Sequence, residues 1–323
     1  MRLFTSFFLL IILFVSSKNI PATFSEEKYE DHTEVDRRPE MIVLGTMQDA
    51  GSPHIACKKD CCKDFFDNPD PNRKVVSLGF IDHKNKKTFL IEATPDISTQ
   101  LKHLNRISGF DNELPNGIFL THAHIGHYTG LMYLGKEAVN AAEVPVYVMP
   151  RMKGFLESNG PWSQLVDTGN IKLEEIKNRK EAGTKSDVSF APILVPHRDE
   201  YSETVGYFIE GPRKKVLFIP DIDKWEKWDI PITEGIKDVD YAFIDATFYS
   251  GEEIDTRDIS AIPHPFIIES MALFDSLPAM EKNKIHFIHF NHTNPILDPN
   301  SDAYKTVIEN GYHISQINDV FKL

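Results

Sequence analysis

The sequence predicts a mixed α/β (α+β) fold in which two β-sheets pack face to face with helices on the outside. The chain has 323 residues, of which 41% are hydrophobic and 26% charged, so it can bury a full core. Short apolar or alternating runs, typical of strands, occur in both halves of the chain between helix-like segments. Two strand-rich halves therefore indicate two packed sheets.

The expected elements of the first half follow from these patterns and from turn residues between them. Strands are expected at 41–46, 75–82, 87–93, 117–121 and 144–149. Helices are expected at 97–107, with Asp96 as the N-cap residue, and at 129–142. The sequence Asn-Gly-Pro-Trp at 159–162 predicts a loop.

The second half repeats the alternation of strands and helices. Strands are expected at 171–176, 188–195, 204–210, 215–220, 241–245 and 284–290, and helices at 266–277 and 301–309. No short sequence repeat is present. Functional side chains are expected on loops at one edge of the two sheets.

The N-terminus is typical of an export signal. Arg2 supplies a positive charge, residues 3–15 are mostly apolar, and Ser16 and Ser17 offer the small side chains of a cleavage site. The apolar run is shorter than the roughly 20 residues of a membrane span, which predicts cleavage rather than stable membrane insertion. We therefore expect a signal peptide at 1–17, a disordered linker at 18–40, a folded domain at 41–323, and a periplasmic or secreted protein.

The charge balance restricts the class of partner. The formal net charge is −13, whereas nucleic-acid-binding proteins carry a basic surface, so no nucleic-acid partner is expected. A small-molecule substrate is compatible with this charge, because a bound metal ion dominates the field inside a cleft. The sequence leaves formation of a homodimer open.

Three closely spaced histidines are the strongest chemical signal in the chain. His122, His124 and His127 have the spacing H-x-H-x-x-H and directly follow the apolar run at 117–120. On a strand, His122 and His124 point to the same face, and His127 can turn towards a second, adjacent ion. Neutral imidazole is a common ligand of zinc and also suits iron. The spacing favours a metal site over a polar turn with chance histidines.

Three further ionisable residues stand at or within apolar runs. His197 and Asp221 each follow such a run, and His289 lies inside one. Burial of these groups without a partner costs free energy, so each needs a hydrogen bond or an ion. As an ordered series with the first three histidines, they extend the predicted metal site.

All three cysteines lie in one short segment, at Cys57, Cys61 and Cys62. In an exported protein the usual expectation is a disulfide, here from Cys57 to one of the other two, with one thiol left free. The alternative is a structural zinc site with three thiolates and a histidine from elsewhere in the chain. The spacing alone leaves both open.

The order and spacing of the histidines and aspartate resemble those of the metallo-β-lactamase superfamily across 41–323. The resemblance implies a four-layer αββα sandwich. It also implies a first metal held by His122, His124 and His197. The implied second metal is held by His127 and His289, and Asp221 bridges the two ions. Gly126 stands where the superfamily has an aspartate ligand, which predicts that the second site is weakened or empty.

Within this superfamily, four stretches of the sequence resemble the pyrroloquinoline quinone biosynthesis protein B family most. They are Leu44-Gly45-Thr46, Ala93-Thr94-Pro95-Asp96-Ile97, Asp245-Ala246-Thr247-Phe248 and the run from His289 to Asp298. In a related phosphodiesterase, a histidine three residues after the last active-site histidine completes a zinc site with cysteines. The resemblance therefore implies that His292 joins Cys57, Cys61 and Cys62. The spacing C-x3-C-C departs from the relative's C-x-C-x2-C.

These residues predict an exported metal-dependent hydrolase of the metallo-β-lactamase superfamily, with one or two zinc ions in the active site and one structural zinc. A metal lowers the pKa of coordinated water, which then attacks an ester, phosphodiester or amide-type bond. Asp221 is expected to orient the water or act as base. His264 is a candidate general acid, with an ordinary loop histidine between two prolines as the alternative. Asp245 and Asp96 are expected to brace the ligands.

Two other functions stay open. Histidines with one carboxylate are also the ligand set of iron oxygenases, so an iron-dependent hydroxylase like the quinone-biosynthesis relatives is the first alternative. A non-catalytic small-molecule binder is the second. No basic cluster in the sequence marks a phosphate clamp, so the substrate is not indicated.

Overall fold

The computed structural model describes residues 37–253 and 262–323. The predicted signal peptide and residues 18–36 of the predicted linker lie outside this range, and the first strand begins at Glu40. Within the described residues, no helix has the length and apolar character needed to cross a membrane.

The first sheet combines an antiparallel and a parallel part. In spatial order its strands are β13 (Val320–Lys322), β1 (Glu40–Gly45), β2 (Ser77–Asp82), β3 (Lys87–Ile91), β4 (Gly117–Phe119), β5 (Val144–Val148) and β6 (Ile171–Glu175). Strands β13, β1, β2 and β3 pair antiparallel, whereas β3, β4, β5 and β6 pair parallel. The C-terminal strand β13, which the sequence did not predict, thus returns to the edge of the first sheet.

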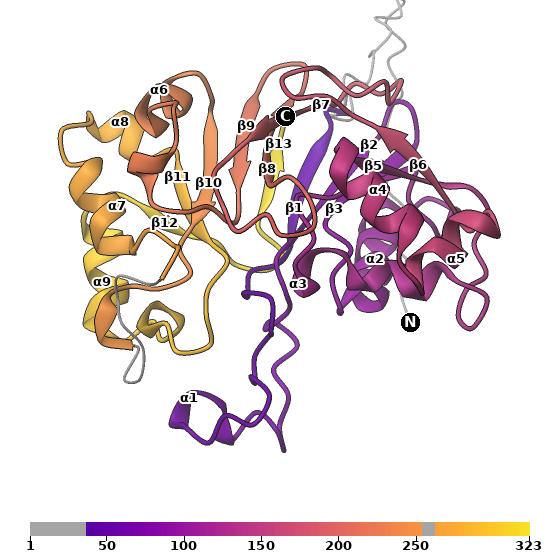
Figure 1. Ribbon diagram of the computed structural model, residues 1–323. Helices are drawn as coiled ribbons and strands as arrows, with labels where there is room; N and C mark the ends of the chain where they lie inside the picture. The colour runs from indigo at the N-terminus through magenta and orange to yellow at the C-terminus, as the bar shows by residue number, and fades with distance from the viewer. Residues whose placement is uncertain (1–36, 254–261) are drawn as a thin grey trace, which may run out of the picture. The chain divides into compact units, whose positions relative to one another are not determined.

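The second sheet has the same mixture. Its spatial order is β12 (His313–Ile314), β11 (Ile285–Ile288), β10 (Tyr241–Asp245), β9 (Lys215–Ile219), β8 (Val205–Glu210) and β7 (Ser189–Leu194). Strands β9 to β12 are parallel, and β7, β8 and β9 are antiparallel. The two sheets lie next to each other at the centre of Figure 1.

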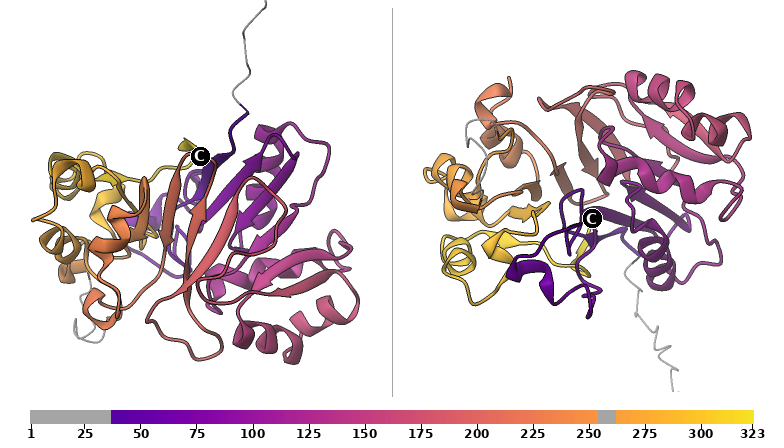
Figure 2. Two further views of the ribbon diagram at one scale, coloured as in Figure 1. Left: turned by 90° about the horizontal axis from the view of Figure 1, so that it is seen from above. Right: turned by 60° about the horizontal axis from the view of Figure 1, so that its bottom comes forward.

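Most helices lie on the outer faces of the two sheets (Figure 2). On the side of the first sheet are α2 (Ile97–Ser108), α4 (Pro150–Ser158) and α5 (Trp162–Asp167). On the side of the second are α6 (Ile232–Lys237), α7 (Ile267–Leu273), α8 (Ala279–Lys282) and α9 (Asp302–Glu309). The short helices α1 (Asp60–Lys63) and α3 (Ile125–Tyr128) belong to the loops after β1 and β4.

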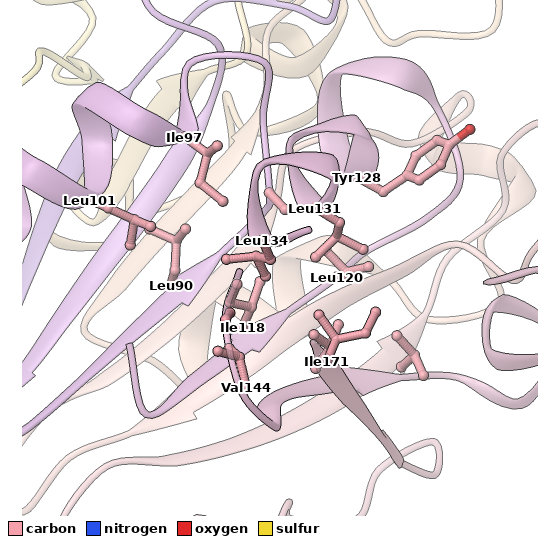
Figure 3. Close-up of a cluster of buried hydrophobic side chains, with 14 of the residues drawn as sticks. Leu90, Ile97, Leu101, Ile118, Leu120, Tyr128, Leu131, Leu134, Val144 and Ile171 are labelled. Atoms are coloured by element: carbon pink, nitrogen blue, oxygen red, sulfur yellow. The ribbon is translucent and has the colours of Figure 1, made fainter. Parts of the chain in front are cut away.

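Three apolar clusters hold these four layers together. The cluster between the sheets contains stacked and edge-on aromatic rings, among them Phe119, Phe190 and Tyr207. A second cluster, which includes Leu90, Ile118 and residues of α2, fills the space between the first sheet and its helices (Figure 3). A third does the same for the second sheet. The four-layer αββα prediction is confirmed.

Two predicted elements in the first half were wrong. Instead of a helix at 129–142, a 3₁₀ turn spans Thr129–Leu134 and turns follow it. At Gly130 this segment packs closely against the backbone at Thr94. A Cβ on Gly130 would come within 2.1 Å of the Thr94 carbonyl oxygen. The loop predicted at 159–162 is shorter, because Trp162 already begins α5, and helix α4 was not predicted at all.

Candidate metal centre

The predicted ligands converge because they follow the carboxyl ends of different strands. His122 follows β4, His197 follows β7, Asp221 follows β9 and His289 follows β11. The carboxyl ends of the parallel strands meet at one edge of each sheet, and the two sheets face each other. Residues far apart in the sequence are thereby brought to one place.

The first predicted ligand group is assembled around Asp221. Its Oδ2 lies 3.3 Å from His122 Nε2 and 3.9 Å from His124 Nδ1, and its Oδ1 lies 3.2 Å from His197 Nε2. One candidate donor atom from each of the four residues lies within 4.8 Å of the others. Three imidazoles and a carboxylate are a donor set that suits zinc or iron.

A second group shares Asp221 and includes a ligand that the sequence analysis missed. His127, His289 and Asp221 lie together with Asp49, all with donor atoms within 4.8 Å of one another. Asp49 Oδ1 lies 2.7 Å from His127 Nε2 and 3.5 Å from His289 Nε2. Asp49 thus supplies a carboxylate to the second site that the sequence analysis did not count, while the predicted weakening of this site stays a prediction. Asp49 follows β1, and a polar residue just beyond a buried strand was the available signal.

Gly126 leaves the space that Asp49 occupies. A Cβ added to Gly126 would come within 2.4 Å of Asp49 Cα and within 2.9 Å of Asp49 Oδ1. Even the smallest side chain at 126 would therefore collide with the backbone that carries the carboxylate. The glycine that removes one ligand position makes room for a carboxylate from another loop.

A buried carboxylate and a hydroxyl orient the histidines. Glu92 Oε1 lies 3.0 Å from His127 Nδ1 and accepts a 2.5 Å hydrogen bond from Thr121, whose Oγ1 lies 2.8 Å from His122 Nδ1. Such partners fix the ring so that the other nitrogen faces a metal. Glu92 and His289 also adopt left-handed φ angles of 75° and 70°, a strained conformation that clusters at functional sites. Glu92 was missed, although a carboxylate in an apolar run was a visible signal.

His264 lies beside the shared aspartate. Its Nδ1 is 2.8 Å from Asp245 Oδ2 and 3.2 Å from Asp221 Oδ1. Asp245 is also held by the backbone N–H groups of Ile222 and Thr247, which donate to it. His264 is thus part of the centre rather than an ordinary loop residue.

Asp96 does not belong to the centre. It occupies the N-cap position of α2, but its side chain makes no capping hydrogen bond. Instead its Oδ2 accepts a hydrogen bond of 2.8 Å from the backbone N–H of Val75. The expected bracing role of Asp96 is therefore not seen, and its carboxylate ties the end of the loop after β1 to α2.

Some buried nitrogen and oxygen atoms of the centre make no hydrogen bond, and their chemistry shows whether the residues suit a metal ion. Both ring nitrogens of His197 and Oδ1 of Asp221 are buried and make no hydrogen bond. Burying such groups unpaired costs on the order of 1–3 kcal/mol each. All three are nitrogen or oxygen atoms of side chains that ligate metals, and two of them face each other at 3.2 Å. The residues fit a bound cation.

The pKa shifts show which groups of the centre are already in the form that binds a metal. Burial raises the pKa of Asp221, but the charges of His197 and His264 outweigh it and hold this pKa well below its usual range. For Asp49, His127 and His289 likewise outweigh burial and lower the pKa. Burial and the neighbouring His127 lower the pKa of His122. The carboxylates are thus ionised and His122 is neutral, the forms that bind metal. Burial lowers the pKa of His127 and of His289, but the neighbouring carboxylates outweigh it and raise the pKa of His127 well above its usual range and that of His289 to about 9, so a metal must displace a proton from each of these rings.

The cysteine segment forms a second, separate donor cluster with His292. Cys57 Sγ lies 4.0 Å from Cys61 Sγ, which lies 3.9 Å from Cys62 Sγ, and all three thiols are free. A disulfide needs sulfurs about 2.05 Å apart, whereas tetrahedral zinc with bonds of about 2.3 Å spaces them by about 3.8 Å. His292 completes the four donors. The geometry favours the zinc site over the disulfide.

The electrostatics of this cluster agree with a metal role. Burial, then repulsion from Cys62, raises the pKa of Cys61 to about 12, a penalty that a divalent cation removes. Burial and the nearby His54 lower the pKa of His292 to about 4, so its imidazole is neutral. His54 also stacks on His292 with ring centroids 4.4 Å apart. In Figure 1 the cysteine segment, which includes α1, lies at the end of a long loop that extends away from the two sheets.

Comparison with known proteins decides the family. A family model described as the β-lactamase superfamily domain matches residues 87–290, well over half of the chain. The chain belongs to the β-lactamase superfamily. The resemblance stated from the motifs is thereby confirmed, and the fold is the metallo-β-lactamase fold.

Relatives and solved structures agree with this assignment. Coenzyme PQQ synthesis protein B of Methylococcus capsulatus is 24% identical over 302 residues, which cover 84% of this chain and 96% of that protein. The protein of the same name from Klebsiella pneumoniae is 26% identical, with 84% and 94% covered. The structure of Zn²⁺-bound PqqB from Methylobacterium extorquens has a TM-score of 0.70 at 19% identity, covering 88% and 100%. A diphosphatase of the PhnP family has a TM-score of 0.61 at 18% identity, covering 88% and 97%.

Proposed function

We propose that this protein is a metal-dependent hydrolase with two adjacent metal ions in its active site. The observation that carries the proposal is the shared carboxylate. Asp221 belongs to both donor groups, with His122, His124 and His197 on one side and Asp49, His127 and His289 on the other. A carboxylate between two sets of imidazoles is suited to bridging two ions. The superfamily includes metal-dependent hydrolases, and the diphosphatase of similar fold is one named example.

The protein's own residues supply the remaining functions. When bound, the metal ions would activate water and polarise the bond to be cleaved. Asp221 and Asp49 neutralise part of the added positive charge, and Glu92 holds His127 in its orientation. His264 donates a proton to the leaving group, since its ring lies at the centre and is held by Asp245. Burial lowers the pKa of His264, but Asp245 and Asp221 outweigh it and raise this pKa, which keeps a proton available.

An oxidative function is the second candidate. The relatives named for coenzyme PQQ synthesis favour it, and three histidines with one carboxylate also suit iron. The identity of the metal bears on the two candidates, because zinc has no redox chemistry and counts against oxygenation, whereas iron is compatible with oxygenation and also with hydrolysis.

The test is the variant His124→Ala, assayed with 4-nitrophenyl esters, phosphodiesters, anilides and lactones. Loss of one first-site ligand is expected to lower kcat/KM by at least about a hundredfold on any substrate that the native protein hydrolyses. His103→Ala is the matched control, since His103 lies on α2 and contacts Asn318 instead. Native hydrolysis that survives unchanged in His124→Ala contradicts the proposed function.

A further inference from the structure

A large pocket opens beside the candidate metal centre. Its volume is about 760 Å³, and its wall includes His264, the residue that contacts Asp221. The cysteine segment forms one side, and residues near Thr247 and Asn291 form another. A ligand in this pocket therefore has one end at His264, next to the metal centre, and the other against the cysteine segment.

The described lining residues of the pocket include more cations than carboxylates, in a chain that is strongly negative. Among its described lining residues are three cations, Lys58, Lys59 and Arg198, and one carboxylate, Glu253, whereas the chain as a whole has a net charge of −13. Burial raises the pKa of Glu253 to about 7, so this carboxyl group is only partly charged at neutral pH. The lining thus attracts anions even before the metal ions add their charge.

The three cations come from two segments that the fold brings together. Lys58 and Lys59 lie between Cys57 and Cys61, so a metal held by the thiolates also fixes the lysine backbone. Arg198 directly follows His197, and its guanidinium forms an ion pair with Glu200 at 3.9 Å, a distance too long for a hydrogen bond. These residues are about 140 positions apart in the sequence, which is why no basic cluster was visible there.

The remaining wall is largely apolar. Ile55 is 78% exposed and lines the pocket together with Phe248 and Ile262. An exposed isoleucine at a pocket wall gains free energy when an apolar group covers it. Cations and apolar side chains in one cavity suit a ligand that carries an anionic group and an apolar part.

We propose that the substrate is an anionic ester with an apolar portion, and that Lys58, Lys59 and Arg198 recognise its negative charge. This inference rests on the proposed hydrolytic function and adds the substrate class. The anionic group is phosphoryl or carboxylate, since both are bound by lysine and arginine side chains.

The kinetic test uses three substrates with one leaving group: neutral 4-nitrophenyl acetate, mono-4-nitrophenyl succinate and bis(4-nitrophenyl) phosphate. The double variant Lys58→Ala/Arg198→Ala is expected to raise KM about tenfold for an anionic substrate, with kcat nearly unchanged. KM for the acetate should not change. An effect on the succinate alone assigns a carboxylate, and an effect on the phosphodiester alone assigns a phosphoryl group. Equal effects on all three substrates, or none on the anionic ones, overturn the proposal.

A binding test separates this proposal from the hydrolytic function. The probe is 1-anilinonaphthalene-8-sulfonate, an apolar anion whose fluorescence reports binding to the full protein. Its affinity should fall about tenfold in the double variant and stay unchanged in Lys63→Ala, a cation on the same segment that pairs with Asp60. Unchanged affinity overturns the pocket assignment even if hydrolysis is found. Reduced affinity without hydrolysis of any ester supports the assignment and counts against the proposed function.

Discussion

Replacing Asp49 with alanine is expected to remove one of the two active-site metal ions and to lower kcat/KM by about a hundredfold or more. Asp49 supplies the carboxylate nearest to His127 and His289, at 2.7 Å and 3.5 Å from their Nε2 atoms. Without it, the second site keeps two imidazoles and a carboxylate that it shares with the first. Metal content per chain, measured together with turnover, checks the result.

Gly126→Ala gives an independent test of the same site. This change leaves every donor atom in the chain, but its methyl group would lie 2.4 Å from Asp49 Cα and must displace the loop. The same loss of one metal ion is therefore expected. Gly154→Ala is the matched control, because a Cβ at this helical position of α4 meets no atom within 4 Å. A full complement of metal in both Asp49→Ala and Gly126→Ala would falsify the assignment of Asp49.

Replacing Cys62 with serine is expected to remove one metal ion from the cysteine cluster and to destabilise the segment that carries it. Cys62 is fully buried and its Sγ accepts a hydrogen bond from the backbone N–H of His54. Loss of a structural metal is among the most destabilising changes and lowers the free energy of unfolding by on the order of 4 kcal/mol. Here the loss is expected to be local, in the segment that carries the cysteines. Metal analysis and limited proteolysis within 50–74 measure the two effects.

Asp60→Ala is the control for this experiment. Asp60 lies next to the cysteines on α1, but its carboxylate is exposed and pairs only with Lys63 among the contacts seen here. It should retain all metal and its resistance to protease. Retention of metal by Cys62→Ser, or equal cleavage of the two variants, contradicts a structural metal at the cysteines.

The sequence predicted those parts of the fold and of the site that depend on a short run of neighbouring residues. Strands were predicted well because buried strands are short apolar runs, and the ligands at their ends stood out as ionisable residues next to such runs. The helix at 129–142 failed because contact with a distant backbone at Gly130 overrides local propensity. Strand β13 has only three residues, and its pairing with β1 depends on the whole chain.

The missing parts of the site depend on contacts between distant segments. Gly126 was visible as a lost ligand, but only the fold brings Asp49, from the loop after β1, into the vacated space. The same holds for Arg198, which meets Lys58 and Lys59 only across the pocket. The spacing of residues within one motif can be recognised in a single sequence. A residue in one loop that replaces a ligand lost from another loop, as Asp49 does for Gly126, cannot.

Elemental analysis of the full chain, purified without chelators and under low oxygen, tests the central claim most directly. Two ions per chain in the active site and one at the cysteines give a predicted total of three. Zinc is expected in all three positions, and iron in the histidine sites would instead favour the oxidative candidate. A total of one ion per chain, lost in Cys62→Ser and unaffected by His124→Ala, contradicts a metal-dependent active site.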